Sequence, residues 1–211
     1  MNELYELYRP TKFEDMVGSS AEVAVETVRR LQKRGLGGRK FWIIGPSGCG
    51  KSTLAWLIAL EVADRWIIQE VDASGLTLAD VDQLERAWNL CGPGKGGRAY
   101  IINEAHALTP SVVKRLLTAW ERVPQHVVII MTSQVLPTHD DTPALLSRCT
   151  NLKLTADLEE FAASAQEIAR IEGLDGKPIE HYYKLARDEH GNFRAMLQAI
   201  EAGKMLAGGV A

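Results

Sequence analysis

A short glycine-rich segment, GPSGCGKST, constrains the fold of this chain more than any other part of its sequence. It occupies residues 45–53 and matches the pattern G-x-x-x-x-G-K-[ST]. The apolar run FWII directly precedes it, and the amphipathic run TLAWLIALEVA begins at its last residue. A strand, a glycine-rich turn and a helix in this order surround a phosphate group with backbone N–H groups and the positive end of the helix. The segment therefore predicts an α/β fold with a phosphate-binding loop.

Two side chains of this loop carry the expected chemistry. Lys51 supplies a positive charge to the β- and γ-phosphates of a nucleotide, and Ser52 offers its hydroxyl to Mg²⁺. The alternative is a glycine-rich turn without a ligand, but the flanking strand and helix favour phosphate binding. The loop residues expected to hold the nucleotide are Gly45, Pro46, Ser47, Gly48, Cys49, Gly50, Lys51, Ser52 and Thr53.

Short apolar runs alternate with longer helical patterns over the first three quarters of the chain. Near-continuous apolar runs are typical of strands buried on both faces, and the alternation predicts a parallel sheet with helices on both sides. The expected strands are Phe41–Ile44, Trp66–Val71, Ala99–Ile102, Val127–Met131 and Leu152–Leu154. The expected helices are Val23–Lys33, Ser52–Ala63, Leu78–Leu90 and Pro110–Arg122.

The pattern changes after Lys153, where helices follow one another without a strand between them. The expected helices here are Leu158–Ile171, Ile179–Asp188 and Phe193–Ala207. The change predicts two domains, a phosphate-loop domain over residues 1–155 and a small three-helix lid over residues 156–211.

The segment AYIINEAH places an Asn–Glu pair at the end of an apolar strand beside the phosphate loop. Such a strand normally ends in Asp, for Mg²⁺, and then Glu, for the attacking water. Glu104 can orient and polarise that water, whereas Asn103 can only accept a hydrogen bond from a Mg²⁺-bound water. Because positioning and charge carry most of phosphoryl-transfer catalysis, we expect weaker Mg²⁺ binding and slower hydrolysis. A site that binds nucleotide without hydrolysing it is the alternative. His106 is interpreted as a structural residue of the following turn.

Composition narrows the function classes further. With 24 Lys and Arg against 27 Asp and Glu, the net charge is −3, so nucleic-acid binding would need a local patch such as RRLQKRGLGGRK at residues 29–40. The three cysteines fit no metal spacing and indicate a reducing compartment. We find no signal peptide and no apolar run long enough for a membrane, and expect a cytoplasmic protein. The five tryptophans lie mostly in apolar segments and are expected mainly in the core.

Several separated segments together resemble the clamp-loader family of AAA+ ATPases. They are LYRPTKFEDMVGS at residues 7–19, the GPSGCGKST loop, NEAHALTPSVVKRLLTAWERVPQHVVIIMTS at 103–133, LLSRC at 145–149 and GNFRAMLQAIE at 191–201. Their order and spacing hold over nearly the whole chain. Within this family the sequence is similar to the bacterial DNA polymerase III gamma/tau subunit and to the small subunits of replication factor C.

The resemblance implies a RecA-like P-loop ATPase domain, with a five-stranded parallel sheet flanked by helices and followed by a helical lid, that binds ATP and Mg²⁺. It places Ser133 at the sensor 1 position and Arg194 at sensor 2 in the lid. Arg148 corresponds to the arginine finger that acts on the ATP of a neighbouring subunit, a contribution of ~10³–10⁵ in rate. Residues that resemble the adenine pocket are Tyr8, Arg9, Pro10 and Val17. The residues expected to act in hydrolysis are Glu104, Lys51, Arg148, Ser133 and Arg194.

The chain departs from the family pattern in three ways. Asn103 replaces the usual Asp. A cysteine-rich zinc insert is absent, because residues 54–98 contain only Cys91, and no zinc site is expected. No collar domain is expected after the lid. Assembly would then rest on ATP-bridged contacts in a nucleotide-dependent ring or spiral of five or six copies, or on a partner subunit that carries a collar.

The resemblance also implies contacts with the DNA backbone, for which Lys114 and Arg115 on the helix after NEAH are candidates; the alternative is a solvated helix face. A sliding clamp is a further candidate partner. The leading interpretation is a clamp-loader-like ATPase whose hydrolysis rearranges a ring or spiral on DNA. Two alternatives stay open: a nucleotide-binding switch or structural subunit with poor hydrolysis, and a minimal AAA+ remodeller in DNA replication or recombination.

Overall fold

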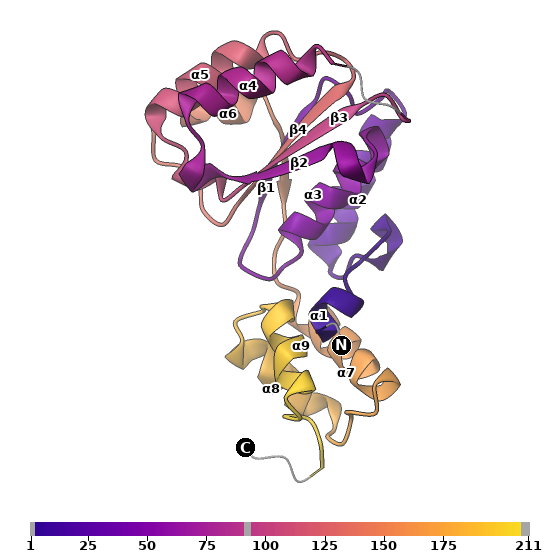
Figure 1. The fold of residues 1–211 in the computed structure, drawn as a ribbon. Coiled ribbons are helices and arrows are strands. Elements are labelled where there is room, and N and C mark those ends of the chain that lie inside the picture. The colour runs from indigo at the N-terminus through magenta and orange to yellow at the C-terminus, as the bar shows by residue number, and fades with distance from the viewer. Residues whose placement is uncertain (1–2, 91–93, 208–211) are drawn as a thin grey trace. The chain divides into compact units, whose positions relative to one another are not determined.

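The computed structural model describes residues 3–90 and 94–207, so Cys91 lies outside the described residues (Figure 1). The chain forms two compact units. The sheet unit contains Glu26–Ile44 and Lys51–Lys153, and the helical unit contains the residues up to Val25, the loop Gly45–Gly50 and the residues from Leu154 onward. The division into domains 1–155 and 156–211 stays a prediction.

The sheet unit is built on five parallel strands in the order β2-β3-β4-β1-β5. The strands are β1 (Lys40–Ile44), β2 (Ile68–Asp72), β3 (Arg98–Asn103), β4 (Val127–Ser133) and β5 (Thr150–Lys153). Every residue of β4 is buried, as a strand covered on both faces requires. The expected five-stranded parallel sheet flanked by helices is confirmed.

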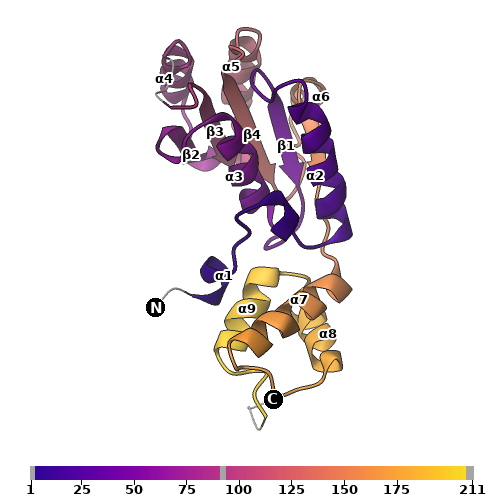
Figure 2. The same cartoon turned by 90° about the vertical axis from the view of Figure 1, so that its right-hand side faces the viewer.

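Helices cover both faces of this sheet (Figures 1 and 2). On one face lie α4 (Leu78–Trp88), α5 (Pro110–Trp120) and α6 (Thr142–Ser147), and on the other lies α3 (Lys51–Val62). The core between the sheet and helices α4, α5 and α6 includes Trp42, Leu116 and Ile129. Helix α2 (Ser19–Gln32) runs from the helical unit into the sheet unit. The short helix α6 was not expected from the sequence.

The second strand begins later than predicted. Arg65–Ile67 form a 3-10 turn before β2, and Trp66 is 71% exposed. The expectation of a core position was therefore wrong for Trp66, because the turn directs it away from the sheet core. It is confirmed for Trp42, Trp88 and Trp120, which are buried.

The helical unit has its own core, which includes Phe161, Tyr182 and Met196. Its helices are α1 (Leu4–Leu7), α7 (Leu158–Ile171), α8 (Ile179–Asp188) and α9 (Phe193–Glu201). Helix α9 is shorter than predicted because Gly203, with φ +84°, takes the left-handed conformation that commonly ends a helix. Among the described residues, every helix is too short or too polar to cross a membrane.

Asp157 links the start of α7 to the start of α2. Its Oδ1 accepts a hydrogen bond from the Glu160 N–H at 3.2 Å, and its Oδ2 accepts one from the Ser19 hydroxyl at 3.1 Å. The backbone N–H of Glu160 and the Ser19 donors hold the pKa of Asp157 below its ordinary value of 3.8. The ionised form is therefore the one that the fold favours.

We expect Asp157→Ala to lower the free energy of unfolding by about 1 kcal/mol, as loss of an N-cap does. Because the folded-state pKa is depressed, the contribution of ionisation is complete well above pH 3.8 and is lost as the pH falls through the folded-state pKa. Thermal melts between pH 2 and 7 measure this. Asp157→Asn keeps a cap but cannot ionise, so wild type should lose its advantage over it in acid; a constant difference would contradict the assignment.

Candidate nucleotide site

The phosphate loop takes a conformation that needs glycine. Gly48 and Gly50 have φ +73° and +95°, in the left-handed region that residues with a side chain rarely adopt. A Cβ atom on Gly48 would lie 1.8 Å from Oδ1 of Asn192, and one on Gly50 would lie 3.1 Å from Cε of Met16. A side chain at Gly48 would therefore overlap Asn192, whereas at Gly50 the cost comes mainly from the left-handed backbone, since the end of the Met16 side chain can shift.

We expect Gly48→Ala to weaken nucleotide binding by tenfold or more, since strain of this kind costs about 1–3 kcal/mol and 1.4 kcal/mol corresponds to about tenfold. A fluorescent ADP analogue titrated with protein measures the affinity. Gly75→Ala is the matched control, because a Cβ at Gly75 meets nothing within 4 Å. Equal affinities of the two variants would show that the loop tolerates a side chain.

Lys51 and Ser52 open helix α3 directly after the loop. Lys51 is only 7% exposed, which is unusual for a lysine. The N–H groups of the first helical turn have no acceptor within the helix and point along its positive end. The start of α3 therefore concentrates positive charge where the sequence predicts the phosphates.

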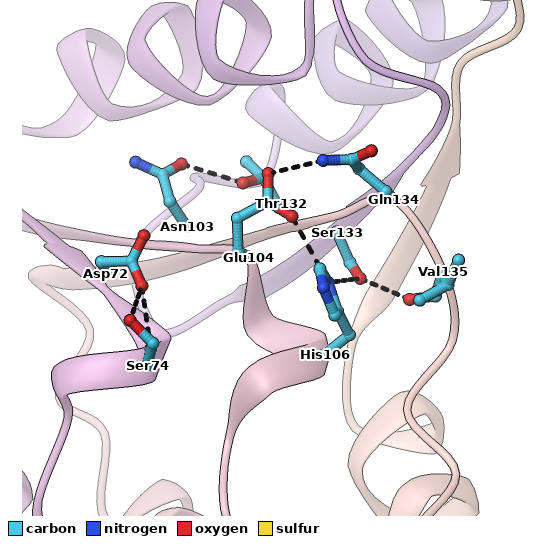
Figure 3. A network of polar contacts seen from close by, with 9 residues as sticks. All are labelled: Asp72, Ser74, Asn103, Glu104, His106, Thr132, Ser133, Gln134 and Val135. Atoms are coloured by element: carbon cyan, nitrogen blue, oxygen red, sulfur yellow. Dashed lines mark hydrogen bonds and ion pairs between the residues drawn. The ribbon is translucent and has the colours of Figure 1, made fainter.

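The carboxyl ends of the parallel strands bring two of the predicted catalytic residues, Glu104 and Ser133, to one edge of the sheet. In the register of the sheet, Asp72 of β2 lies beside Asn103 of β3, and Ser133 of β4 lies beside the last residue of β1. Oδ1 of Asn103 accepts a hydrogen bond from the Thr132 hydroxyl at 2.8 Å (Figure 3). The phosphate loop follows β1 at this same edge.

Glu104 stands in an unusual backbone conformation directly after β3. Its φ of 51° and ψ of 43° are left-handed, which is uncommon for a residue with a side chain. Its Oε1 accepts a hydrogen bond from Nε2 of Gln134 at 3.2 Å, and its buried Oε2 lies 3.4 Å from Nδ1 of His106 (Figure 3). The hydrogen bond from Gln134 holds Oε1 of the carboxylate, while Oε2 accepts no hydrogen bond from the described residues.

Ser133 completes this group of side chains. Its hydroxyl donates to the Val135 carbonyl, and its Oγ lies 3.2 Å from Nδ1 of His106. Because a hydroxyl has one hydrogen, Nδ1 must carry the hydrogen of the bond to Ser133. The interpretation of His106 as a turn residue omitted these contacts, and Gln134 was not singled out at all. The only sequence feature that could have indicated these contacts was the short separation of His106 from Glu104.

Arg148, the predicted arginine finger, ends helix α6 within the sheet unit. Its Nη2 lies 3.3 Å from Oε1 of Glu121, and its Nη1 donates to the Ala144 carbonyl at 3.1 Å. The side chain remains 43% exposed. Nearby, burial raises the pKa of Cys149 to about 12, which keeps that thiol protonated. The two contacts orient the guanidinium, and its role as an arginine finger stays a prediction.

The helical unit holds the remaining predicted nucleotide residues. The Tyr8 hydroxyl donates to Glu172, and the Arg194 guanidinium stacks over the Tyr5 ring at 5.3 Å. Asn192, which packs against Gly48, caps the helix that carries Arg194. Met16 packs against Gly50, next to Val17 in sequence. The roles of Arg9 and Pro10 in the adenine pocket stay predictions.

The two DNA candidates differ in their surroundings. The side chain of Lys114 is 71% exposed and lies 3.9 Å from an oxygen of Asp141. Arg115 is 27% exposed, donates from Nε to Asp82 at 2.8 Å, and pairs with Glu85 through Nη2. The charge of Arg115 is thus balanced within the chain, while that of Lys114 is largely open to solvent.

Comparison with known proteins identifies the family of this chain. Residues 41–155, more than half of the chain, match the family described as ATPase family associated with various cellular activities (AAA). This chain belongs to the AAA family of ATPases. The match includes the phosphate loop, the Asn103–Glu104 pair and Arg148.

Individual relatives of this AAA chain include a DNA polymerase III subunit and an ATPase. It is 28% identical to the DNA polymerase III subunit gamma/tau of Mycoplasma pneumoniae, over 94% of this chain and 32% of that protein. It is 28% identical to the ATPase WRNIP1 of Dictyostelium discoideum, over 72% of this chain and 17% of that protein. The chain thus spans a third or less of these relatives. The expected resemblance to clamp-loader ATPases is confirmed.

Among solved structures, RuvB of Thermotoga maritima shares the fold of this AAA chain. The TM-score is 0.73 at 19% identity, over 92% of this chain and 64% of that structure. At this identity the likeness concerns the fold alone.

The residues present also fit the Mg²⁺ that AAA ATPases use with ATP. Hydroxyl, amide and carboxylate oxygens of Ser52, Asn103 and Glu104 are donors that Mg²⁺ prefers. Among the described residues, no three His, Cys, Asp or Glu side chains converge to hold a metal by themselves.

Proposed function

We propose that this protein binds ATP with Mg²⁺ and hydrolyses it, and that hydrolysis rearranges an assembly that acts on DNA in the manner of a clamp loader. The observation that carries the proposal is the arrangement of residues at the carboxyl ends of the parallel strands. The phosphate loop follows β1 there, and Glu104 and Ser133 stand at the ends of the neighbouring strands with oriented side chains.

Each residue has a role in this chemistry. The loop N–H groups and Lys51 balance phosphate charge, while Ser52 and Asn103 hold the ion directly or through water. Glu104 accepts a hydrogen bond from the attacking water and orients it toward the γ-phosphate. When bound, Mg²⁺ neutralises charge that develops on the phosphate oxygens. Ser133 as sensor 1, Arg194 as sensor 2 and Arg148 in trans complete the proposed machinery.

The relatives support the proposed assembly and its target. A DNA polymerase III subunit and a protein described as a Holliday junction branch migration motor are both named for work on DNA. We propose a nucleotide-dependent ring or spiral of five or six copies, or assembly with a partner subunit that carries a collar. Exposed Lys114 and the basic segment at residues 29–40 would contact the DNA backbone, and a sliding clamp is the proposed protein partner.

Asn103 favours a second candidate, a switch that binds ATP without hydrolysing it. Steady-state ATP hydrolysis with and without primer–template DNA separates the two functions. DNA-stimulated turnover that is lost in Glu104→Gln supports the ATPase. Bound ATP with no turnover under either condition, and with no difference between wild type and Glu104→Gln, supports the switch.

Mass measurement tests the assembly. We expect a monomer without nucleotide and a five- or six-membered species with a non-hydrolysable ATP analogue. A monomer in both states would contradict assembly through ATP-bridged contacts.

A further inference from the structure

Asn103 lacks the negative charge of an aspartate, but a carboxylate lies directly against it. Nδ2 of Asn103 donates a hydrogen bond to Oε1 of Glu70 at 2.6 Å. Glu70 belongs to β2, the neighbour of β3 in the sheet. The charge that is missing on the side chain at position 103 is therefore present one hydrogen bond away.

Glu70 is held in this place from a second side. Its Oε2 accepts a hydrogen bond from Nε1 of Trp56 at 2.9 Å, and the Arg65 guanidinium lies 5.7 Å from the centre of the Trp56 ring. Trp56 follows Ser52 by one helical turn on α3, and side chains four residues apart lie on the same helix face. Because helical side chains lean toward the N-terminus, Trp56 leans toward the turn that carries Ser52. Glu70 thus bridges the strand end at Asn103 and the first turns of α3.

The charge of Glu70 also selects one orientation of the Asn103 amide. An ionised carboxylate can only accept hydrogen bonds, so Nδ2 must face Glu70. The carbonyl oxygen then faces Thr132, whose hydroxyl donates to it at 2.8 Å, and one lone pair of that oxygen stays available. With the amide reversed, its oxygen would lie against the carboxylate.

The other acidic residue at this end of β2 is occupied elsewhere. Oδ1 of Asp72 accepts hydrogen bonds from the Ser74 N–H at 2.9 Å and from the Ser74 hydroxyl at 2.5 Å (Figure 3). Although Asp72 lies beside Asn103 in the sheet register, its carboxylate accepts these hydrogen bonds within its own turn. It therefore serves as an internal comparison for Glu70.

We propose that Glu70 is a positioning residue for the metal ion of the bound nucleotide. It supplies the negative charge that Asn103 lacks and fixes the Asn103 carbonyl toward the edge where a Mg²⁺-bound water would donate to it. This inference rests on the proposed ATP-binding function. It explains how a chain with Asn at this position can retain an ion-dependent nucleotide site.

The test measures Mg²⁺ dependence of nucleotide binding rather than activity. A fluorescent ADP analogue is held at fixed concentration with the full chain, and Mg²⁺ is titrated to find its midpoint. We expect Glu70→Gln to raise the midpoint about five- to tenfold, as loss of one nearby, partly screened charge does. Affinity measured in EDTA should stay within twofold of wild type. Trp56→Phe, which keeps the ring but removes the N–H donor, should give a smaller shift in the same direction.

Two further variants test whether the negative charge of Glu70, rather than its role in the fold, sets the Mg²⁺ midpoint. Asn103→Asp combined with Glu70→Gln moves the carboxylate by one hydrogen bond, and should return the midpoint to within twofold of wild type. Asp72→Asn should leave the midpoint unchanged. Three outcomes would overturn the role of Glu70 but not the proposed ATP binding. They are an unchanged midpoint in Glu70→Gln, no rescue in the double variant, and an equal shift in Asp72→Asn. A wild-type chain that binds no nucleotide at any Mg²⁺ concentration would overturn the proposed function as well.

Discussion

Arg148→Ala should lower the rate of ATP hydrolysis by about 10³-fold or more while nucleotide affinity stays within about twofold, because an arginine finger acts mainly on the charge of the transition state. The fold should survive the substitution. The ion pair with Glu121 is half-exposed, and pairs of that kind contribute less than about 1 kcal/mol. Steady-state hydrolysis and nucleotide titration measure the two effects separately.

Mixing experiments decide whether the finger acts in trans. Arg148→Ala subunits keep Glu104, and Glu104→Gln subunits keep the arginine, so a mixture should regain hydrolysis that neither variant has alone. Arg122→Ala is the matched control, since that arginine is 78% exposed and lies 4.0 Å from its nearest carboxylate partner, Glu85. Loss of binding together with hydrolysis, or no recovery in the mixture, would assign Arg148 a structural role.

Lys51→Ala should reduce nucleotide affinity itself by about 10- to 150-fold, because hydrogen bonds to charged groups contribute about 1.5–3 kcal/mol. Hydrolysis should fall with it. Calorimetric titration with ADP measures the change. Lys184→Ala, at an exposed position on α8, controls for loss of one positive charge from the chain. Equal affinities of the two variants would show that Lys51 does not contact the phosphates.

The sequence predicted those parts of the molecule that local patterns determine. A buried parallel strand such as β4 has a continuous apolar run, and the phosphate loop has a fixed spacing of glycines, Lys51 and Ser52. The confirmed sheet and the family follow from these patterns. Helices α7 and α8 have the predicted bounds because their apolar periodicity and their flanking residues agree.

Contacts between distant residues could not be predicted in the same way. Glu70 and Asn103 come from different strands, and only the sheet register brings them together. The contact of Gln134 with Glu104 depends on the left-handed turn after β3, which has no sequence signal because residues with side chains seldom adopt it. The exposed Trp66 was wrongly assigned for a related reason, since an apolar residue beside a strand can lie in the turn that precedes it.

The strand order has a consequence for synthesis of the chain on the ribosome. The first strand to emerge, β1, pairs with the last two: Lys40 lies beside Ile129 of β4, and Phe41 beside Thr150 of β5. Non-local pairing of this kind is slow, because a long loop must close before any contact compensates for its entropy. The loop that follows β1 therefore lacks its supporting strand neighbours until nearly all of the sheet has been translated. If the proposed nucleotide binding holds, nucleotide would stabilise only chains whose sheet is complete and would leave nascent chains unaffected.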